Sequence, residues 1–313
     1  MKILVTGGEG FIGSWVVEKL SSMGHQITTL DSGETYDVIS RTDMDRLCQW
    51  RQRNWKNVKK ISGDVIMPLN RFCIRGQDIV IHLASYPRAK IVNEQPEMGV
   101  ENIVVGTTGM LQDCVEHGVK RFVYISSSMI YGDFKDGTTE EAQAEPNNIY
   151  GVAKLAGEKI TQQFGRHMGL EYVVARPSGV YGPGDIPDRV LSKFFSAAMS
   201  DDTIKVHDQD IKVDFTYVED AADGIIKCAL EESAGNKIFN ITAGAALSLG
   251  DAAKKIIALT VSKSMIKDTG KNNLYPERGT LDISKARKLL KYNPQHSFDK
   301  GIAKYYEWLQ NKI

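Results

Sequence analysis

Residues 6–13 of this chain read TGGEGFIG, and this stretch decides the fold. It follows a short apolar run at residues 3–5 and leads into residues 15–20, where the apolar side chains have helical spacing. A strand, a glycine-rich turn and a helix in this order are typical of a dinucleotide site, because the glycines allow a tight turn and a close approach of backbone to a pyrophosphate. The helix N-terminus then adds amide donors and a positive dipole end.

A carboxylate follows at the position expected for the ribose of such a dinucleotide. Residues 26–30 form a second expected strand, and Asp31 at its end stands 18 residues after Gly13. A carboxylate at this distance accepts hydrogen bonds from the adenosine ribose but repels a 2′-phosphate. The next residues, Ser32 and Gly33, carry no positive charge. The sequence therefore favours NAD(H) over NADP(H).

Apolar runs alternate with amphipathic stretches through the first half of the chain. We expect further strands at 60–62, 78–83, 121–125 and 172–175, and helices that include 102–116 and 150–168. This alternation predicts an α/β fold of the Rossmann type, a doubly wound parallel sheet with helices on both faces. The polar stretch 32–58 is interpreted as a helix or an ordered insertion.

The alternation weakens beyond Arg176. We expect later strands at 215–218 and 237–241, and helices at 188–199, 220–230, 249–258 and 284–290. The sequence thus predicts an NAD-binding domain over residues 1–176 and a smaller C-terminal α/β substrate-binding region over 177–313. Some of the later strands are expected to return to the first domain.

Composition excludes several classes of protein. The 313 residues include 39 Lys and Arg against 39 Asp and Glu, so the formal net charge is zero, whereas nucleic-acid binders normally carry a basic surplus. No apolar run approaches the roughly 18 residues that span a bilayer, and the start lacks the pattern of a signal peptide. The four cysteines are far apart, which favours reduced thiols and no metal site. We expect a cytoplasmic protein without nucleic-acid or membrane partners.

Tyr150 and Lys154 form a candidate catalytic pair. They stand four residues apart at the start of an expected helix, so they share one face. A nearby ammonium and a cationic nicotinamide would stabilise the phenolate and let the tyrosine act as a general base. Three serines at residues 126–128 end the expected strand 121–125. Their hydroxyls should therefore lie at the carboxyl edge of the sheet, where open α/β sheets bind ligands.

Several motifs together resemble those of one family. The chain resembles the extended short-chain dehydrogenase/reductase superfamily, in its NAD-dependent epimerase/dehydratase branch, over nearly its whole length. The resemblance is carried by TGGEGFIG, Gly63-Asp64-Val65, His82-Leu83-Ala84, Asn102 with Gly106-Thr107, the serine run ending in Tyr131-Gly132, Tyr150 with Lys154, Arg176-Pro177, residues 180–184, Asp214-Phe215, and Arg278 with Asp282.

The motifs and the resemblance together imply roles for individual residues. The implied catalytic residues are Ser127, Tyr150 and Lys154, with Tyr150 as the acid/base. The implied NAD site comprises Gly7, Gly10, Phe11, Ile12, Gly13, Asp31, Asp64, Val65, Leu83, Ala84, Ser85, Ser126, Tyr150, Lys154, Pro177 and Val180. The candidate substrate-binding residues are Arg88, Ser128, Lys212 and Arg278. The resemblance also implies a homodimer whose interface is built by the helices near 100–116 and 152–168.

The chain departs from the family pattern at two places. Dehydratase members resemble Thr-Asp-Glu, and decarboxylase members Ser-Glu, where this chain has Ser127 followed by Ser128 and Met129. Neither residue can act as the acid/base that those reactions need, so sugar 4,6-dehydration and uronate decarboxylation are disfavoured. Gly179 and Val213 replace an asparagine and an arginine that contact substrate in nucleotide-sugar members, which leaves the substrate class open.

The function predicted from these features is an NAD-dependent nucleotide-sugar 4-epimerase that acts through a transient 4-keto intermediate. An NAD(H)-dependent sugar or nucleotide-sugar dehydrogenase or ketoreductase is the alternative, because it requires the same three catalytic residues. A 4,6-dehydratase and a non-catalytic NAD-binding protein are further alternatives. The nucleotide and the sugar stay open.

Overall fold

The structure, a computed structural model, describes residues 1–34, 39–86, 88–271 and 275–312. A seven-stranded sheet lies at its centre in the order β3-β2-β1-β4-β5-β6-β9, and every neighbouring pair is parallel. Its strands are β1 (Lys2–Thr6), β2 (Gln26–Asp31), β3 (Lys59–Ser62), β4 (Ile79–His82), β5 (Arg121–Ile125), β6 (Glu171–Pro177) and β9 (Lys237–Ile241). The predicted doubly wound α/β fold is confirmed.

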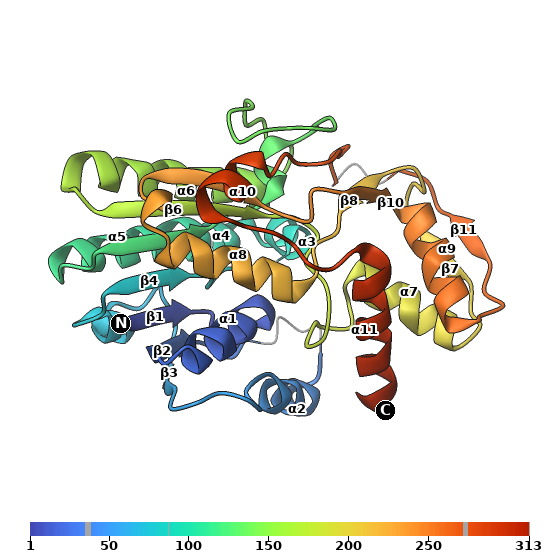
Figure 1. Cartoon of the computed structure of the whole chain (residues 1–313), viewed down its shortest axis with the longest axis horizontal. Coiled ribbons are helices and arrows are strands. Elements are labelled where there is room, and N and C mark those ends of the chain that lie inside the picture. The colour runs from blue at the N-terminus through green and yellow to red at the C-terminus, as the bar shows by residue number, and fades with distance from the viewer. Residues whose placement is uncertain (35–38, 87, 272–274, 313) are drawn as a thin grey trace.

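Helices cover both faces of this sheet because its central strands are apolar on both sides. Ile3 and Val5 of β1 pack on one face with α1 (Phe11–Ser22), α8 (Val218–Leu230) and α10 (Ser284–Leu290). Leu4, between them, packs on the opposite face with Met110 and its neighbours in α5 (Thr107–Glu116). Figure 1 shows α6 (Ile149–Met168) beside α5.

The remaining helices vary in type and length. The α-helices are α2 (Arg41–Arg51), α3 (Ala89–Glu94), α4 (Pro96–Val100), α7 (Val190–Met199), α9 (Leu249–Thr260) and α11 (Phe298–Lys312). Three are 3₁₀ helices, namely η1 (Pro68–Ile74), η3 (Ser128–Tyr131) and η4 (Glu232–Ala234). The helix predicted at 102–116 is divided, since η2 (Glu101–Gly106) is a π-helical segment that leads into α5.

A second core forms beyond the sheet, on the right of Figure 1. It contains two small sheets, β8 (Lys212–Asp214) antiparallel to β10 (Ala246–Ser248), and β7 (Ile204–Val206) parallel to β11 (Ile266–Asp268). Helices α7, α9 and α11 pack there, and α2 contributes Met44 and Leu47. Trp50 at the end of α2 lies 5.2 Å from the Trp308 ring of α11. The polar stretch 32–58 therefore contains a helix that joins the C-terminal half to the glycine-rich end of the chain.

The strand predicted at 215–218 is wrong. Strand β8 ends at Asp214 and helix α8 begins at Val218, so the segment between them is a link. Tyr217 pairs with Tyr181 through a single bridge only. Glu219 and Asp220 stand in the first turn of α8, where a helix favours negative charge, and they stop the run from extending as a strand. The side chains of residues 215–218 are all buried, and their aromatic and β-branched composition is the one that strands favour.

Strand β9 comes from the second half of the chain and pairs with β6 along its full length. Strand β6 itself runs to Pro177, across the predicted division at residue 176. That division stays a prediction.

A buried ion pair joins α6 to the sheet. Arg176 of β6 donates to both carboxylate oxygens of Glu158 in α6, at 2.9 and 2.7 Å, and both side chains are buried. Its Nη1 also donates to the Tyr131 hydroxyl at 2.8 Å. That hydroxyl donates in turn to Oδ1 of Asn240 in β9, at 2.7 Å. One network thus connects α6, β6, η3 and β9.

We expect Arg176→Met to destabilise the protein by about 3–5 kcal/mol, because it leaves the Glu158 carboxylate buried without its partner. Urea unfolding followed by circular dichroism measures this change. Lys254→Met is the matched control, since Lys254 pairs with Asp251 at 3.0 Å on the surface and should cost less than about 1 kcal/mol. Equal effects of the two substitutions would contradict the importance of the buried pair.

Candidate active site

The glycine-rich turn packs so closely that its glycines are required. Gly7 has φ +67°, in the region that favours glycine, and a Cβ there would lie 2.7 Å from the Ala84 backbone nitrogen. A Cβ on Gly13 would collide with the Gly7 carbonyl oxygen. The turn therefore holds the start of α1 directly against the end of β1, as a pyrophosphate site requires.

The N-terminus of α1 is open for an anion. Gly10 occupies the N-cap position, no side chain caps the helix, and no acidic residue stands in its first turn. The first amides of a helix lack partners within it, so those of Phe11, Ile12 and Gly13 can donate to a phosphate. This cradle of backbone fits the pyrophosphate of NAD.

Asp31 lies against the glycine-rich turn. Its Oδ2 accepts a hydrogen bond from the Glu9 backbone nitrogen, and its Oδ1 accepts one from that of Gly33, both at 2.9 Å. These bonds hold the carboxylate in place, and each oxygen keeps a lone pair for a ribose hydroxyl. The structure thus brings together the glycine-rich turn and Asp31, two cofactor features that the sequence predicts.

The loops after β3 and β4 carry the next group of predicted cofactor residues. Leu83 and Ala84 donate their backbone N–H groups to Thr6, to its carbonyl at 3.1 Å and its hydroxyl at 3.2 Å. This places them beside the glycine-rich turn, where the strand order reverses between β1 and β4. Asp64 accepts a bond from the Ile66 nitrogen at 2.9 Å, Val65 is buried beneath it, and Ser85 donates to the Tyr86 carbonyl.

The three predicted catalytic residues meet at the carboxyl end of β5. The Ser127 hydroxyl lies near the Tyr150 phenol, where it acts to lower the pKa of that phenol, and it accepts a bond from the Met129 nitrogen at 3.2 Å. Lys154 donates to the Ile125 carbonyl at 2.9 Å, and its Nζ lies 5.9 Å from the centre of the Tyr150 ring. Asn148 caps α6 by accepting a bond from the Gly151 nitrogen.

Burial controls the charges of this group. It raises the pKa of Tyr150, while the Arg189 charge and the hydrogen bond from Ser127 act in the opposite direction. Burial also lowers the pKa of Lys154 to about 7, against the pull of Glu158. Lys154 can therefore gain or lose a proton near neutral pH, which suits a lysine that assists proton transfer by a neighbouring tyrosine.

His82 lies beneath this group and is a core residue. It contacts the hydroxyls of Thr6 and Thr107, at 2.8 and 3.1 Å. Burial, and then the charge of Lys154, lower the pKa of His82 to about 3. The imidazole is therefore neutral and holds β1, β4 and α5 together.

Three more predicted cofactor residues lie at the ends of β5 and β6. The hydroxyl of Ser126 is buried and has no hydrogen-bond partner among the described residues, so it is available to a ligand at this edge. Pro177 ends β6, where it pairs with Ile241 of β9, and Val180 follows in the next loop.

Two of the predicted substrate residues gather near Tyr150. Arg88 pairs with Asp188. Within the described parts of the chain, Nε and Nη2 of Arg88 have no hydrogen-bond partner, and Nε of Arg278 has none either. Burial lowers the pKa of both arginines to about 10, and the nearby Tyr275 phenol acts to raise the pKa of both. Tyr275 packs in the same apolar cluster as Tyr150. The arrangement can therefore bind an anionic group of a substrate.

The other two predicted substrate residues are engaged by protein groups. The Ser128 hydroxyl is buried and donates to that of Ser178 at 3.1 Å. Lys212 is half exposed and pairs with Asp136 at 2.9 Å. A role for either in binding substrate stays a prediction.

The two departures from the family pattern lie against each other. Gly179 has φ +49°, and a Cβ there would lie 2.6 Å from Cγ1 of the buried Val213. A side chain at position 179 would therefore collide with Val213 as it lies in this structure. The two exchanges lie side by side and leave an apolar surface at this place.

Sequence reasoning missed a pair of charged residues next to this site. Asp185 is buried, and burial raises its pKa to about 6 despite the nearby charges of Arg189, Arg51 and Arg88. Arg189 Nε lies 3.8 Å from Oδ1 of Asp185. The charge of the same arginine acts to lower the pKa of Tyr150. Their i,i+4 spacing directly after the glycines of residues 182–184 is the signal that could have identified them.

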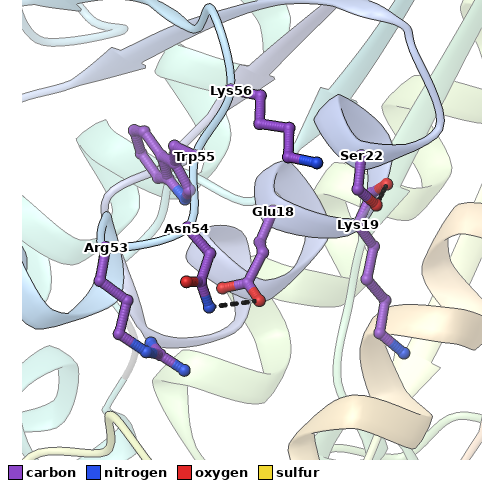
Figure 2. Close-up of a pocket in the computed structure, with 7 residues that line it drawn as sticks. All are labelled: Glu18, Lys19, Ser22, Arg53, Asn54, Trp55 and Lys56. Carbon is purple, nitrogen blue, oxygen red and sulfur yellow. Dashed lines mark hydrogen bonds between the residues drawn. The ribbon is translucent and has the colours of Figure 1, made fainter.

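A surface cavity of about 520 Å³ lies apart from this group, on the outer side of α1 (Figure 2). It is lined by Glu18, Lys19, Ser22, Arg53, Asn54, Trp55 and Lys56. None of the predicted site residues lines it. Within the described ranges, no three His, Cys, Asp or Glu side chains lie together as a metal site would need, and no helix is long and apolar enough to span a membrane.

Comparison with known proteins identifies the family. The profile of the NAD dependent epimerase/dehydratase family matches residues 3–242. The chain belongs to this family. Its members depend on NAD, so the protein is an NAD-dependent enzyme of the extended short-chain dehydrogenase/reductase type, as the resemblance predicts.

Its curated relatives include both epimerases and dehydratases. A protein of Bacillus subtilis, named an uncharacterized UDP-glucose epimerase, is 27% identical over 317 residues that cover 99% of this chain and 98% of that protein. A dTDP-glucose 4,6-dehydratase of Streptomyces niveus is also 27% identical, over 325 residues that cover 99% and 93%.

Solved structures agree on the fold. The UDP-glucuronic acid 4-epimerase of Bacillus cereus, in complex with UDP-glucuronic acid and NAD, superposes with a TM-score of 0.93 at 24% identity, and each chain is covered completely. The UDP-glucose 4-epimerase of Thermotoga maritima, with UDP-glucose, gives 0.88 at 25% identity and covers 100% of this chain and 99% of its own.

We expect Asp31→Ala to weaken NAD binding by about 1–3 kcal/mol, because a charge-assisted hydrogen bond to the ribose is lost. The affinity for NADP relative to NAD should rise. Asp78→Ala is the control, because Asp78 also accepts a backbone bond, from Lys2 at 2.9 Å, but stands before β4 at the opposite edge of the sheet. Calorimetric titration with both cofactors measures these changes, and a wild type that prefers NADP would contradict the assignment.

Proposed function

We propose that the protein is an NAD-dependent nucleotide-sugar 4-epimerase. The observation that carries this proposal is the meeting of Ser127, Tyr150 and Lys154 beside the glycine-rich turn, with no carboxylate at positions 128 and 129. Bound NAD supplies a hydride acceptor that later returns the hydride. The chain has to move one proton and to hold the sugar.

The roles of the three side chains follow from their positions. Tyr150 removes the proton of the sugar C4 hydroxyl, and Ser127, whose hydroxyl lies near the phenol, donates to the same oxygen. The Lys154 cation beside the ring stabilises the phenolate. After the 4-keto sugar has turned its other face, Tyr150 returns the proton to the oxygen. A change of configuration at C4 results.

A 4,6-dehydratase would need a further acid/base next to Ser127. The structure supports an epimerase instead, because the Ser128 hydroxyl is bound to Ser178 and Met129 is a buried thioether. The dehydrogenase or ketoreductase alternative uses the same three residues and differs in releasing the reduced or oxidised cofactor after each turnover.

A nucleotide sugar is the substrate class that best suits this site. The names of the Bacillus subtilis relative and of the Thermotoga maritima structure both refer to UDP-glucose. In this chain, the incompletely bonded guanidinium groups of Arg88 and Arg278 lie near Tyr150 and can meet a diphosphate.

We expect Tyr150→Phe to lower turnover by at least about 10²–10⁴-fold while NAD still binds, because the ring stays and the proton-transferring oxygen is lost. Ser127→Ala should cost on the order of 10²–10³-fold, the value of one positioned donor. Lys154→Met should lower both the rate and the affinity for NAD. Products of UDP-, GDP-, CDP- and dTDP-sugars, resolved by NMR, give the rates.

The control for these substitutions is Tyr306→Phe, which changes a tyrosine that stacks on Phe195 in the second core. It should leave the rate unchanged. Near wild-type turnover of Tyr150→Phe on the substrate identified in the screen would show that Tyr150 is not the base.

We also propose a homodimer formed by helices around α6. Val105 and Val152 are 54% and 53% exposed, and Met98 is 42% exposed. They lie on η2, α6 and α4, which pack against one another. Leu111, in contrast, is buried in the core beneath α5 and cannot meet a partner. Exposed apolar side chains on adjoining helices suit a second copy of the same surface.

We expect Val152→Asp to dissociate the dimer, because it places a charge in an apolar contact. Light scattering at micromolar concentration measures the mass. Met265→Asp changes a side chain that is 74% exposed beside β11 and should leave the mass unchanged. A monomeric wild type would rule out the dimer.

A further inference from the structure

Glu9, the polar residue inside the glycine-rich turn, lies next to Asp31. Its backbone nitrogen donates to Oδ2 of Asp31 at 2.9 Å. Its own carboxylate is half-buried, and burial followed by the charge of Asp31 raises the pKa of Glu9. The backbone contact and this effect on the pKa place the Glu9 carboxylate within Coulombic range of Asp31.

A chain of hydrogen bonds orients the Glu9 carboxylate. Gln52, directly after α2, donates from Nε2 to Oε2 of Glu9 at 2.7 Å. The Oε1 of Gln52 accepts a bond from the Lys60 ammonium at 2.9 Å. Because that oxygen faces an ammonium, the amide nitrogen has to face Glu9. The helix of the 32–58 stretch thus holds this carboxylate in place.

The cations around the two carboxylates are committed to protein oxygens. Arg51 donates to the carbonyls of Glu9 and Gly184, at 3.1 and 3.0 Å. Arg41 donates to the Gly33 carbonyl at 3.0 Å. Lys60 is held by Gln52, as described above. These bonds hold the cations in place but leave their charge, so repulsion of a phosphate beside Asp31 depends on the two carboxylates.

We propose that Glu9 is a second determinant of cofactor choice, which acts with Asp31 to admit the 2′-hydroxyl of NAD and to exclude the 2′-phosphate of NADP. A hydroxyl can donate to a carboxylate, whereas a phosphate meets Coulomb repulsion from both carboxylates at a half-buried site. The Glu9 side chain has no other hydrogen-bonding role than its contact with Gln52 among the bonds of the described residues.

Competitive equilibrium dialysis tests this proposal. The protein, loaded with labelled NAD, is dialysed at pH 8 against increasing NADP, and the ratio of the two dissociation constants is determined. Glu9→Gln keeps the size of the side chain and should shift the ratio toward NADP on the order of tenfold, as the loss of one screened repulsion predicts. Glu18→Gln is the matched control. Glu18 is also a carboxylate near α1 that accepts an amide bond, from Asn54 at 3.1 Å, but it lies at the surface cavity (Figure 2).

Glu9→Gln is also made in a protein that carries Asp31→Asn. This double variant shows whether Glu9 acts on cofactor choice directly or only through Asp31. We expect Glu9→Gln to shift the ratio further toward NADP in that background. The proposal is wrong if the shift equals that of Glu18→Gln, or if it vanishes when Asp31 is replaced. It is equally wrong if Glu9→Gln weakens both cofactors by the same factor, because the residue would then only shape the turn.

Discussion

The bidentate contact between Arg176 and Glu158 is the constraint on which the site depends. Glu158 lies one turn after Lys154 on α6, so fixing it against β6 also fixes the helix face that carries Tyr150. The same guanidinium binds Tyr131, which lies at the end of the loop that begins with Ser127. A buried bidentate pair restricts how α6 can lie against β6, and this arrangement holds Tyr150 and Ser127 near each other.

The electrostatics of the site follow from the same packing. Burial raises the pKa of Tyr150 and lowers that of Lys154, so each group is pushed toward its neutral form. Glu158 would draw a full charge onto Lys154, but its carboxylate is already committed to Arg176. Burial outweighs the charge of Glu158 and lowers the pKa of Lys154 to about 7.

Local patterns could be predicted from the sequence, whereas contacts between distant segments could not. The glycine-rich turn, Asp31 and the Tyr150–Lys154 pair are each specified by spacing within one strand or helix. The packing of α2 against α11, and the contact between Gln52 and Glu9, depend on where the fold brings separate segments. The link at 215–217 has the aromatic and β-branched composition of a strand, but it forms only a single bridge, between Tyr217 and Tyr181.

Gly179 and Val213 show how such a distant contact bears on function. Considered separately, each exchange is the loss of a polar side chain, but the structure shows one apolar contact in which a side chain on Gly179 would collide with Val213. If the substrate carries a charged group, as we propose, Arg88 and Arg278 keep unsatisfied donors that can bind it. The proposed catalytic residues match the family pattern while Gly179 and Val213 depart from it, because proton transfer requires a fixed geometry and binding of the rest of the substrate does not.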